Sequence, residues 1–218
     1  MRGKLITLEG LDGAGKSTQL AWISLFLEQH GVAVRVTREP GGTPLGETLR
    51  TVLLDARQPL HPGTETLLMF AARCEHLDKI ILPALRAGMW VLCDRFTDAT
   101  FAYQGGGSGV AWDKIDLLEK WVQEGLTPDL TLYFDVSTEV GRERTGAIKA
   151  PDRYERERES FHERTRTAYL RRARESQGRM LIIDANRSIE AIQAELETIL
   201  LSLCATVSSL RGIHIDPR

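Results

Sequence analysis

The sequence predicts an α/β layered domain built around a phosphate-binding loop. Three observations carry this prediction. Short apolar runs alternate along the chain with longer segments of helical periodicity, as in domains where strands and helices form separate layers. An unbroken G-x-x-x-x-G-K-[ST] pattern stands between the first apolar run and the first helical segment. Charged and glycine-containing stretches follow directly after the first three apolar runs, where ligands bind in open α/β sheets.

The phosphate-binding loop is Gly10-Leu11-Asp12-Gly13-Ala14-Gly15-Lys16-Ser17, and Thr18 follows it. Glycines allow the backbone to curl so that several N–H groups point at one phosphate group. The helix that we expect to start near Lys16 adds its positive N-terminal end. Lys16 would bring an ammonium group to the outer phosphates, and Ser17 would offer its hydroxyl to Mg²⁺. We therefore predict a nucleotide site here, in preference to a structural glycine turn.

The five apolar runs are the predicted strands. Because they lack a clean polar alternation, they are typical of strands buried on both faces of a parallel sheet, joined by right-handed crossovers. The runs are Leu5–Leu8, Val32–Val36, Trp90–Cys93, Leu130–Phe134 and Met180–Ile183. The predicted helical segments are Gln19–Gln29, Pro44–Leu54, Glu65–Ala87, Trp112–Glu124 and Ile189–Leu203. A glycine-rich stretch, 103–109, is expected to be a loop inside the domain.

Length and composition limit the function classes. A chain of 218 residues suits one sizeable domain. The 28 basic and 30 acidic residues give a net charge of −2, which argues against a general nucleic-acid binder. Three widely spaced cysteines indicate reduced thiols in a cytoplasmic protein, with no signal peptide visible. No apolar run approaches the length of a membrane span, so we expect no membrane partner.

Two residues at the end of the third strand are candidates for phosphate chemistry. Asp94 has the position of the carboxylate that holds Mg²⁺ through water in such sites, although an aspartate there can also start a turn. Arg95 has a planar guanidinium suited to a phosphate group, and the alternative is a plain ion pair. Arg38 to Gly42 combines a charged pair with a rigid turn, and alone this is a weak signal.

Seven motifs in this order and spacing resemble the thymidylate kinase family over roughly residues 1–203. They are Glu9-Gly10-Leu11-Asp12-Gly13-Ala14-Gly15-Lys16-Ser17-Thr18-Gln19, Arg38-Glu39-Pro40-Gly41-Gly42, Phe70-Ala71-Ala72-Arg73, Asp94-Arg95-Phe96, Tyr103-Gln104-Gly105, Pro128-Asp129-Leu130 and Asp152-Arg153-Tyr154-Glu155. The resemblance implies a P-loop nucleoside-monophosphate kinase fold, with a five-stranded parallel sheet of order 2-3-1-4-5 flanked by helices and a short lid. It also implies ATP- and Mg²⁺-dependent phosphorylation of dTMP to dTDP, a step toward dTTP, by a homodimer.

The resemblance also implies a dTMP site. Asp12 would lie near the sugar 3′-hydroxyl, and Arg95 with Arg38 would hold the phosphate. Arg73 would bind the thymine, and Tyr103 would wall off the 2′ position against ribonucleotides. The implied base contacts are completed by Thr100, Gln104 and a stacking residue, either Met69 or Phe70. The family usually places that stacking aromatic where Met69 stands in this chain.

The loop residue Ala14 bears on where the other catalytic basic residues of the site lie. One branch of the family carries a basic residue at that position, and the other moves its catalytic arginines into a lid. The resemblance therefore implies a lid at about 142–155. We expect Arg144 and Arg153 to be functional, with Arg144 also at the ATP, and Arg142 and Lys149 as further candidates. The competing interpretation is that the arginines between 153 and 174 mostly form a solvated helix face, which Phe161, Ala168 and Tyr169 would pack inward.

Two further expectations concern the C-terminal part of the chain. Asn186 follows the last predicted strand and could contact the adenine, although asparagine is also common in turns. Residues 204–218 would form a short C-terminal extension after a single kinase domain of residues 1–203.

The implied chemistry needs positive charge in place of a general base. The acceptor would be a phosphate oxygen that is already largely dianionic at neutral pH. Lys16, Arg95, Arg144 and Arg153 would then be the catalytic groups that bring two polyanions together. A nucleotide-dependent switch is a rival class, but the guanine-reading Asn-Lys-x-Asp is absent from the sequence. A kinase for another nucleoside monophosphate is the second rival, and a nucleic-acid binder a distant third.

Overall fold

The computed structural model of the chain describes residues 2–57, 59–145, 153–154 and 157–210. Its centre is a five-stranded parallel sheet in the order β2-β3-β1-β4-β5, which confirms the predicted topology. The strands are β1 (Leu5–Glu9), β2 (Val34–Arg38), β3 (Trp90–Asp94), β4 (Leu130–Asp135) and β5 (Met180–Asp184). Asp94 pairs in register with Leu8 on one side and Arg38 on the other, so the carboxyl ends of these strands lie at one edge.

Burial differs between the inner and the outer strands. Every residue of β1 is buried. Strands β3 and β4 are buried except for their last residues, Asp94 and Asp135. The prediction that all five strands are buried on both faces is wrong for β2 and β5. Val36 and Ile182 are 45% and 46% exposed, because an edge strand has a neighbouring strand on one side only.

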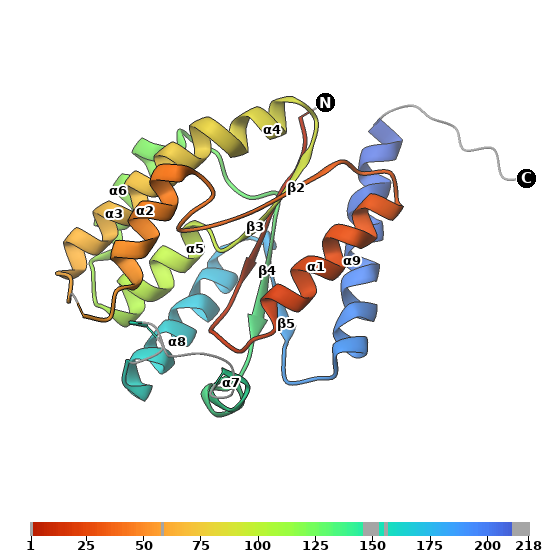
Figure 1. The fold of residues 1–218 in the computed structure, drawn as a ribbon. Helices are drawn as coiled ribbons and strands as arrows, with labels where there is room; N and C mark the ends of the chain where they lie inside the picture. The colour runs from red at the N-terminus through yellow and green to blue at the C-terminus, as the bar shows by residue number, and fades with distance from the viewer. Residues whose placement is uncertain (1, 58, 146–152, 155–156, 211–218) are drawn as a thin grey trace, which may run out of the picture.

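Helices cover both faces of the sheet. Figure 1 shows α1 (Lys16–Gln29) and α9 (Ile189–Leu210) together on one side of the strands. On the other side lie α2 (Pro44–Leu54), α3 (Pro62–His76), α6 (Trp112–Gln123) and α8 (Glu159–Glu175). The main core between these layers contains Ile6, Leu8, Ile23 and Tyr133, all buried. The bounds of α2 match the prediction, since Pro44 fixes its first turn and the Thr43 side chain accepts from Gly46 N.

The predicted helical segment Glu65–Ala87 is continuous but not uniform. After α3 the chain widens into a π-helical turn, η1 (Leu77–Ile81), and continues as α4 (Leu82–Arg86). Pro83 cannot donate a backbone hydrogen bond, and the change in helix geometry comes directly before it. The segment therefore remains one rod that carries the buried side chains of α3 alongside the sheet.

The prediction of a loop at the glycine-rich stretch is wrong. The chain is helical there, in α5 (Thr97–Thr100) and the π-helix η2 (Phe101–Gly107). A Cβ atom at Gly106 would lie 2.5 Å from Ala168 Cβ, and one at Gly107 would lie 2.5 Å from the Phe161 ring. The glycines thus permit η2 to pack closely on α8 and do not mark a turn. This packing holds the side chains of η2 in fixed positions beside the carboxyl edge of the sheet.

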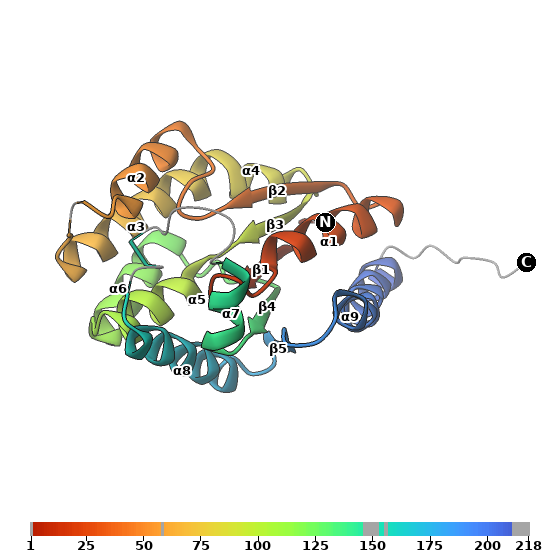
Figure 2. The same cartoon turned by 60° about the horizontal axis from the view of Figure 1, so that its bottom comes forward.

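The C-terminal half completes the edge where ligands are expected. Figure 2 shows α7 (Thr138–Thr145) beside the loop between β1 and α1. In α8, Phe161, Ala168 and Tyr169 are buried as predicted. Arg166 and Arg172 depart from the expected solvated face, because they bind Asp135 and Asp98 through charged hydrogen bonds of 2.7 Å. Helix α9 runs seven residues past the predicted boundary at 203. No helix in the described part of the chain is long and apolar enough to cross a membrane.

Candidate active site

The phosphate-binding loop has the predicted strand–loop–helix context. Helix α1 begins at Lys16, directly after Gly15 with a φ angle of 81°. Gly13 also has a positive φ of 80°, and a Cβ atom there would lie 2.2 Å from the carbonyl oxygen of Gly141 in α7. Glycine is therefore required at this position both by backbone conformation and by the close approach of α7.

Lys16 lies folded onto this loop. Its Nζ donates to the carbonyl oxygens of Gly10 and Leu11 at 3.0 and 2.9 Å, and the residue is 7% exposed. Burial, together with the nearby Arg95 guanidinium, lowers the pKa of Lys16 from 10.5 to about 8. A phosphate group brought against this ammonium would favour its charged form and would replace the two carbonyl contacts.

Arg95 stands at the end of β3 in a strained backbone conformation. Its φ angle of 68° lies in the left-handed region that residues other than glycine rarely adopt. The guanidinium donates to Asp12 Oδ1 at 2.8 Å and to Gly10 O at 2.9 Å, and it lies over the Tyr103 ring. These contacts hold Arg95 against the phosphate-binding loop. Arg95 thus forms the plain ion pair, with Asp12, and also lies beside a candidate phosphate position.

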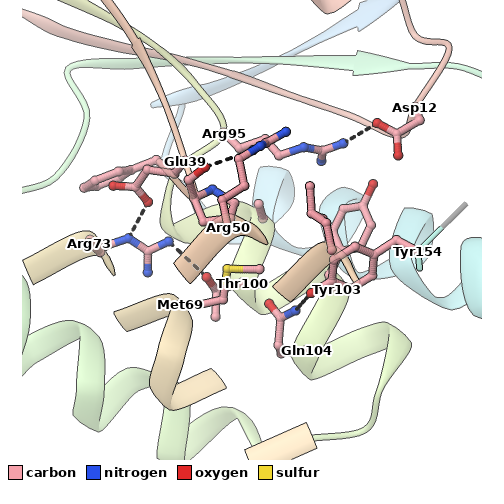
Figure 3. A pocket seen from close by; sticks show the side chains of 14 residues that line it. Asp12, Glu39, Arg50, Met69, Arg73, Arg95, Thr100, Tyr103, Gln104 and Tyr154 are labelled. Atoms are coloured by element: carbon pink, nitrogen blue, oxygen red, sulfur yellow. Dashed lines mark hydrogen bonds and ion pairs between the residues drawn. The ribbon is translucent and has the colours of Figure 1, made fainter. Parts of the chain in front are cut away.

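Two adjoining pockets open at this edge of the sheet. The first, which we call the acceptor pocket, lies among α2, α3 and η2 (Figure 3). It is lined by Asp12, Glu39, Pro40, Arg50, Leu54, Met69, Arg73, Arg95, Phe96, Ala99, Thr100, Tyr103, Gln104 and Tyr154. The second, the nucleotide cleft, follows the phosphate-binding loop. It is lined by residues 12–19 and by Glu39, Arg50, Asp94, Arg95, Arg144, Arg187, Ser188, Ile189 and Ile192. Asp12, Glu39, Arg50 and Arg95 line both, so they stand where the two pockets meet.

Arg73 is a buried, anchored cation on the wall of the acceptor pocket. Its Nε donates to Glu39 Oε2 at 2.7 Å and its Nη2 donates to Thr100 Oγ1 at 3.0 Å. The guanidinium also lies near the rings of Phe70 and Phe96. Its Nη1 is buried and has no hydrogen-bond partner among the described residues. An unpaired donor on a buried charged group is costly, which makes this atom a recognition point for an acceptor on a ligand.

The anchor of Arg73 continues behind the pocket. His76 is fully buried, and its Nδ1 lies 3.0 Å from the second oxygen of Glu39. Its Nε2 lies 2.6 Å from Thr37 Oγ1 on β2. Glu39 thus receives a contact on each oxygen. Its contact with Arg73, drawn in Figure 3, holds that guanidinium in one orientation. The Arg-Glu-Pro-Gly-Gly element therefore supplies the Glu39 carboxylate, which supports the pocket. From the sequence alone, this element could equally be a plain turn.

The structure separates the two candidates for the stacking residue. Met69 lines the acceptor pocket, whereas Phe70 is 2% exposed, lines neither pocket and packs in a core cluster with Phe101 and Ile115. The two neighbours on α3 point in different directions because successive helical residues are about 100° apart. Phe70 therefore does not reach the pocket and cannot make the expected base contact from this position. Phe96, Tyr103 and Tyr154 are the aromatic residues of the wall, and the Tyr103 hydroxyl is buried without a partner among the described residues.

Of the two arginines expected to hold the acceptor phosphate, Arg95 lines both pockets and Arg38 does not. Arg38 has a half-exposed side chain, pairs with Glu47 at 2.8 Å and lines neither pocket. Arg50 of α2 lines both pockets and donates to Pro40 O at 2.9 Å. Arg50 was missed because a helical arginine two turns from a proline-containing turn gives no distinct sequence signal.

Asp94 and Ser17 lie in the nucleotide cleft, as predicted for a Mg²⁺ site. The Oδ1 atom of Asp94 is buried and accepts no hydrogen bond from any described residue. A buried carboxylate oxygen without a donor fits a hydrated cation. The described residues contain no group of three acidic, histidine or cysteine side chains that could hold a metal alone.

The predicted lid residues are only partly at the site. Arg144 lines the nucleotide cleft and donates to Gly13 O at 3.4 Å and Ala185 O at 3.0 Å. Arg153 lines neither pocket and binds Leu53 O and the Glu65 carboxylate. Asn186 also lines neither, since its side chain contacts Asp184 and Ser137 N. Lys149 and the side chain of Arg142 lie outside the described residues.

These features together define a class of protein. A phosphate-binding loop on a parallel sheet of order 2-3-1-4-5, with an acceptor pocket beside it, is the arrangement of a P-loop nucleoside-monophosphate kinase.

Comparison with known proteins identifies the family. A family model described as thymidylate kinase matches residues 8–196. The chain is 58% identical over 205 residues to a thymidylate kinase from Nitrosospira multiformis, covering 94% of this chain and 100% of that protein. It is 59% identical over 198 residues to one from Nitrosomonas europaea, with 91% and 92% covered. A crystal structure of thymidylate kinase from Ehrlichia chaffeensis superposes with a TM-score of 0.74 at 34% identity, covering 92% and 99%. The chain belongs to the thymidylate kinase family.

Proposed function

We propose that this chain transfers the γ-phosphate of ATP to dTMP, giving dTDP and ADP, with ATP in the nucleotide cleft and dTMP in the acceptor pocket. The observation that carries the assignment of the pocket is Arg73. Its buried Nη1 faces no protein acceptor among the described residues, while Glu39 and Thr100 fix the rest of the guanidinium. Such a donor suits a carbonyl oxygen on a flat base, and thymine presents two.

The residues that line both pockets would hold the reacting phosphates. Arg95 and Arg50 bring positive charge to the junction, and Asp12 orients Arg95 through a 2.8 Å contact. In this arrangement Arg50 takes the second phosphate-binding role that the sequence assigned to Arg38. Because the acceptor phosphate is already dianionic, the site needs positioning and charge and no general base. Lys16 and the loop N–H groups supply the charge on the donor side.

We place Mg²⁺ at Ser17 and Asp94, with Asp94 acting through water. The unpartnered buried oxygen of Asp94 supports this position. When bound, Mg²⁺ neutralises charge on the donor phosphates.

Arg144 is the described lid residue best placed to act on ATP. It contacts the phosphate-binding loop at Gly13 and lines the nucleotide cleft. Arg153 would have to leave Glu65 and the Leu53 carbonyl to reach the transferred group, so its catalytic role requires its side chain to move.

A substrate panel tests this function. Steady-state kcat/KM is measured with ATP and dTMP, dUMP, UMP, CMP or AMP as acceptor, following ADP release. We expect dTMP to be the preferred acceptor and ADP release to depend on it. Equal ADP release with and without dTMP would instead indicate a nucleotide-dependent switch, and preference for another monophosphate would reassign the acceptor.

We further propose that the chain acts as a homodimer through α3 and α6. Leu67, Ala71 and Cys74 form an exposed stripe along α3, since they are spaced by four and three residues. Leu117 and Trp121 form a second stripe on the neighbouring α6, with exposed fractions of 68% and 75%. Exposed apolar area of this kind commonly marks a protein interface. In sedimentation, Trp121→Glu should shift the chain from dimer to monomer, and a wild-type monomer would contradict the proposal.

The remaining assignments follow from the same picture. We take residues 1–203 as one kinase domain and residues 204–218 as a C-terminal extension. The absence of a disulfide among the described cysteines supports a reducing, cytoplasmic location.

A further inference from the structure

The carboxylate of Glu65 lies behind the acceptor pocket and takes part in none of the roles above. It belongs to the first turn of α3 and is 2% exposed. Three donors converge on it: Gln104 Nε2 at 2.6 Å, the Tyr154 hydroxyl at 2.8 Å, and the Arg153 guanidinium. Gln104 lines the pocket, while Glu65 does not. Glu65 therefore acts on the pocket through Gln104.

The chemistry of the partners fixes the direction of the hydrogen bonds between Glu65, Gln104 and Tyr154. A carboxylate paired with an arginine only accepts, so Gln104 must turn its NH₂ group toward Glu65. The second hydrogen of that NH₂ group goes to the Tyr154 oxygen at 3.1 Å, and the Tyr154 hydrogen goes to Glu65. Both amide hydrogens of Gln104 are thus occupied behind the wall. Its amide oxygen accepts no hydrogen bond from a described residue and is the group left to face the pocket.

This orientation gives the pocket a donor–acceptor pair. Arg73 Nη1 is the donor, and Gln104 Oε1 is the acceptor; both residues line the acceptor pocket (Figure 3). A base with a ring N–H beside a carbonyl oxygen matches the pair, as in thymine and uracil. Cytosine presents the opposite pattern, with an unprotonated ring nitrogen beside an amino group. A Gln104 amide turned the other way would present an N–H donor to the N3–H of the base and would lose this match.

We propose that Glu65 is a positioning residue that fixes the amide orientation of Gln104 and so sets the acceptor pocket for a base with an N3–H donor. This inference rests on the proposed function, because it assumes that dTMP binds in the acceptor pocket. Glu65 would thus help the pocket to discriminate between bases with and without an N3–H, and this role is separate from any contribution of Glu65 to folding.

The test removes the N3–H from the ligand and the carboxylate from the protein in turn. Dissociation constants are measured by calorimetry for dTMP and for its 3-deaza analogue, in which a C–H replaces the N3–H. Wild type should bind dTMP roughly ten-fold more tightly than the analogue, as expected for one buried hydrogen bond. In Glu65→Gln, either end of the new amide can face Gln104, and the ratio should fall to about two-fold or less.

A matched variant separates orientation from packing. Tyr154→Phe removes one partner of Gln104 but leaves the carboxylate, so the ratio should stay near that of the wild type. A purely structural role of Glu65 would weaken both ligands equally, and an unchanged ratio in folded Glu65→Gln would overturn the inference. So would a wild-type ratio near one, although dTMP binding would then still support the proposed function. Wild type that does not bind dTMP would instead refute the proposed function itself.

A second measurement covers the case in which Glu65→Gln does not fold. Neutron diffraction from wild-type crystals locates the two amide hydrogens of Gln104 directly. Hydrogens on the side of Glu65 and Tyr154 support the inference, and hydrogens on the side of the pocket overturn it.

Discussion

Replacing Glu39 with glutamine should destabilise the fold and weaken the dTMP site together. Glu39 pairs with Arg73 at 2.7 Å, and the two side chains are 5% and 2% exposed. Removing the negative charge leaves a buried guanidinium without its counter-charge, a change that costs on the order of 3–5 kcal/mol in buried pairs. Because the glutamine oxygen can still accept from Arg73 Nε, we expect a loss near the lower end, about 3 kcal/mol.

The matched control is the same substitution at an exposed pair. Glu47 binds Arg38 at 2.8 Å, with side chains 42% and 53% exposed, so Glu47→Gln should cost about 0–1 kcal/mol. Urea unfolding followed by circular dichroism gives both values, provided that the denaturant dependence is unchanged. Calorimetry should also show dTMP binding about ten-fold weaker in Glu39→Gln, because Arg73 is less firmly held. Equal destabilisation of the two variants would show that burial does not strengthen the Glu39–Arg73 pair.

Three further predictions concern the phosphate-binding loop, the lid and pH. Lys16→Ala should lower turnover by about 100-fold or more with an unchanged melting temperature, and near-normal turnover would contradict the loop assignment. Arg153→Ala should lower kcat while dTMP affinity is nearly kept; a collapse of dTMP binding would assign Arg153 to support of Glu65 instead. Burial, with the nearby Asp98 carboxylate, raises the pKa of Glu9 from 4.5 to about 8, so the folded chain retains a proton that the unfolded chain releases. Stability from this group is present below pH 4.5 and lost as the pH rises toward 8, so Glu9→Gln should flatten the decline in urea-unfolding free energy between about pH 5 and 8. An equally steep decline in the variant would contradict this.

The features that depend on local pattern were predictable from the sequence. The phosphate-binding loop needs glycines and Lys16 at fixed spacing, and the ends of β1 and β3 are marked by Glu9 and Asp94. The order of the strands came from the resemblance to the thymidylate kinase family. Glycines at 105–107 misled the prediction because close helix packing and flexible turns both select glycine, and the sequence does not distinguish these uses.

The support of the acceptor pocket could not be predicted because its contacts join distant parts of the chain. Glu65 meets Gln104 across 39 positions and Tyr154 across 89. The choice of Arg50 over Arg38 likewise depends on Glu47, which occupies Arg38 in the folded chain. Met69 and Phe70 are adjacent in sequence, and only the packing of α3 decides which one reaches the pocket. Residue types indicate the chemistry here, and tertiary contacts decide which residues carry it.

In the proposed function, Arg73 and Gln104 together bind the thymine of dTMP in the acceptor pocket. A crystal structure of the chain with dTMP and an unreactive ATP analogue tests it directly. We expect a thymine carbonyl oxygen within hydrogen-bond distance of Arg73 Nη1, about 2.7–3.2 Å, and the thymine N3 atom within the same range of Gln104 Oε1. Thymine bound elsewhere, or an Arg73 Nη1 turned away from the base, would contradict it.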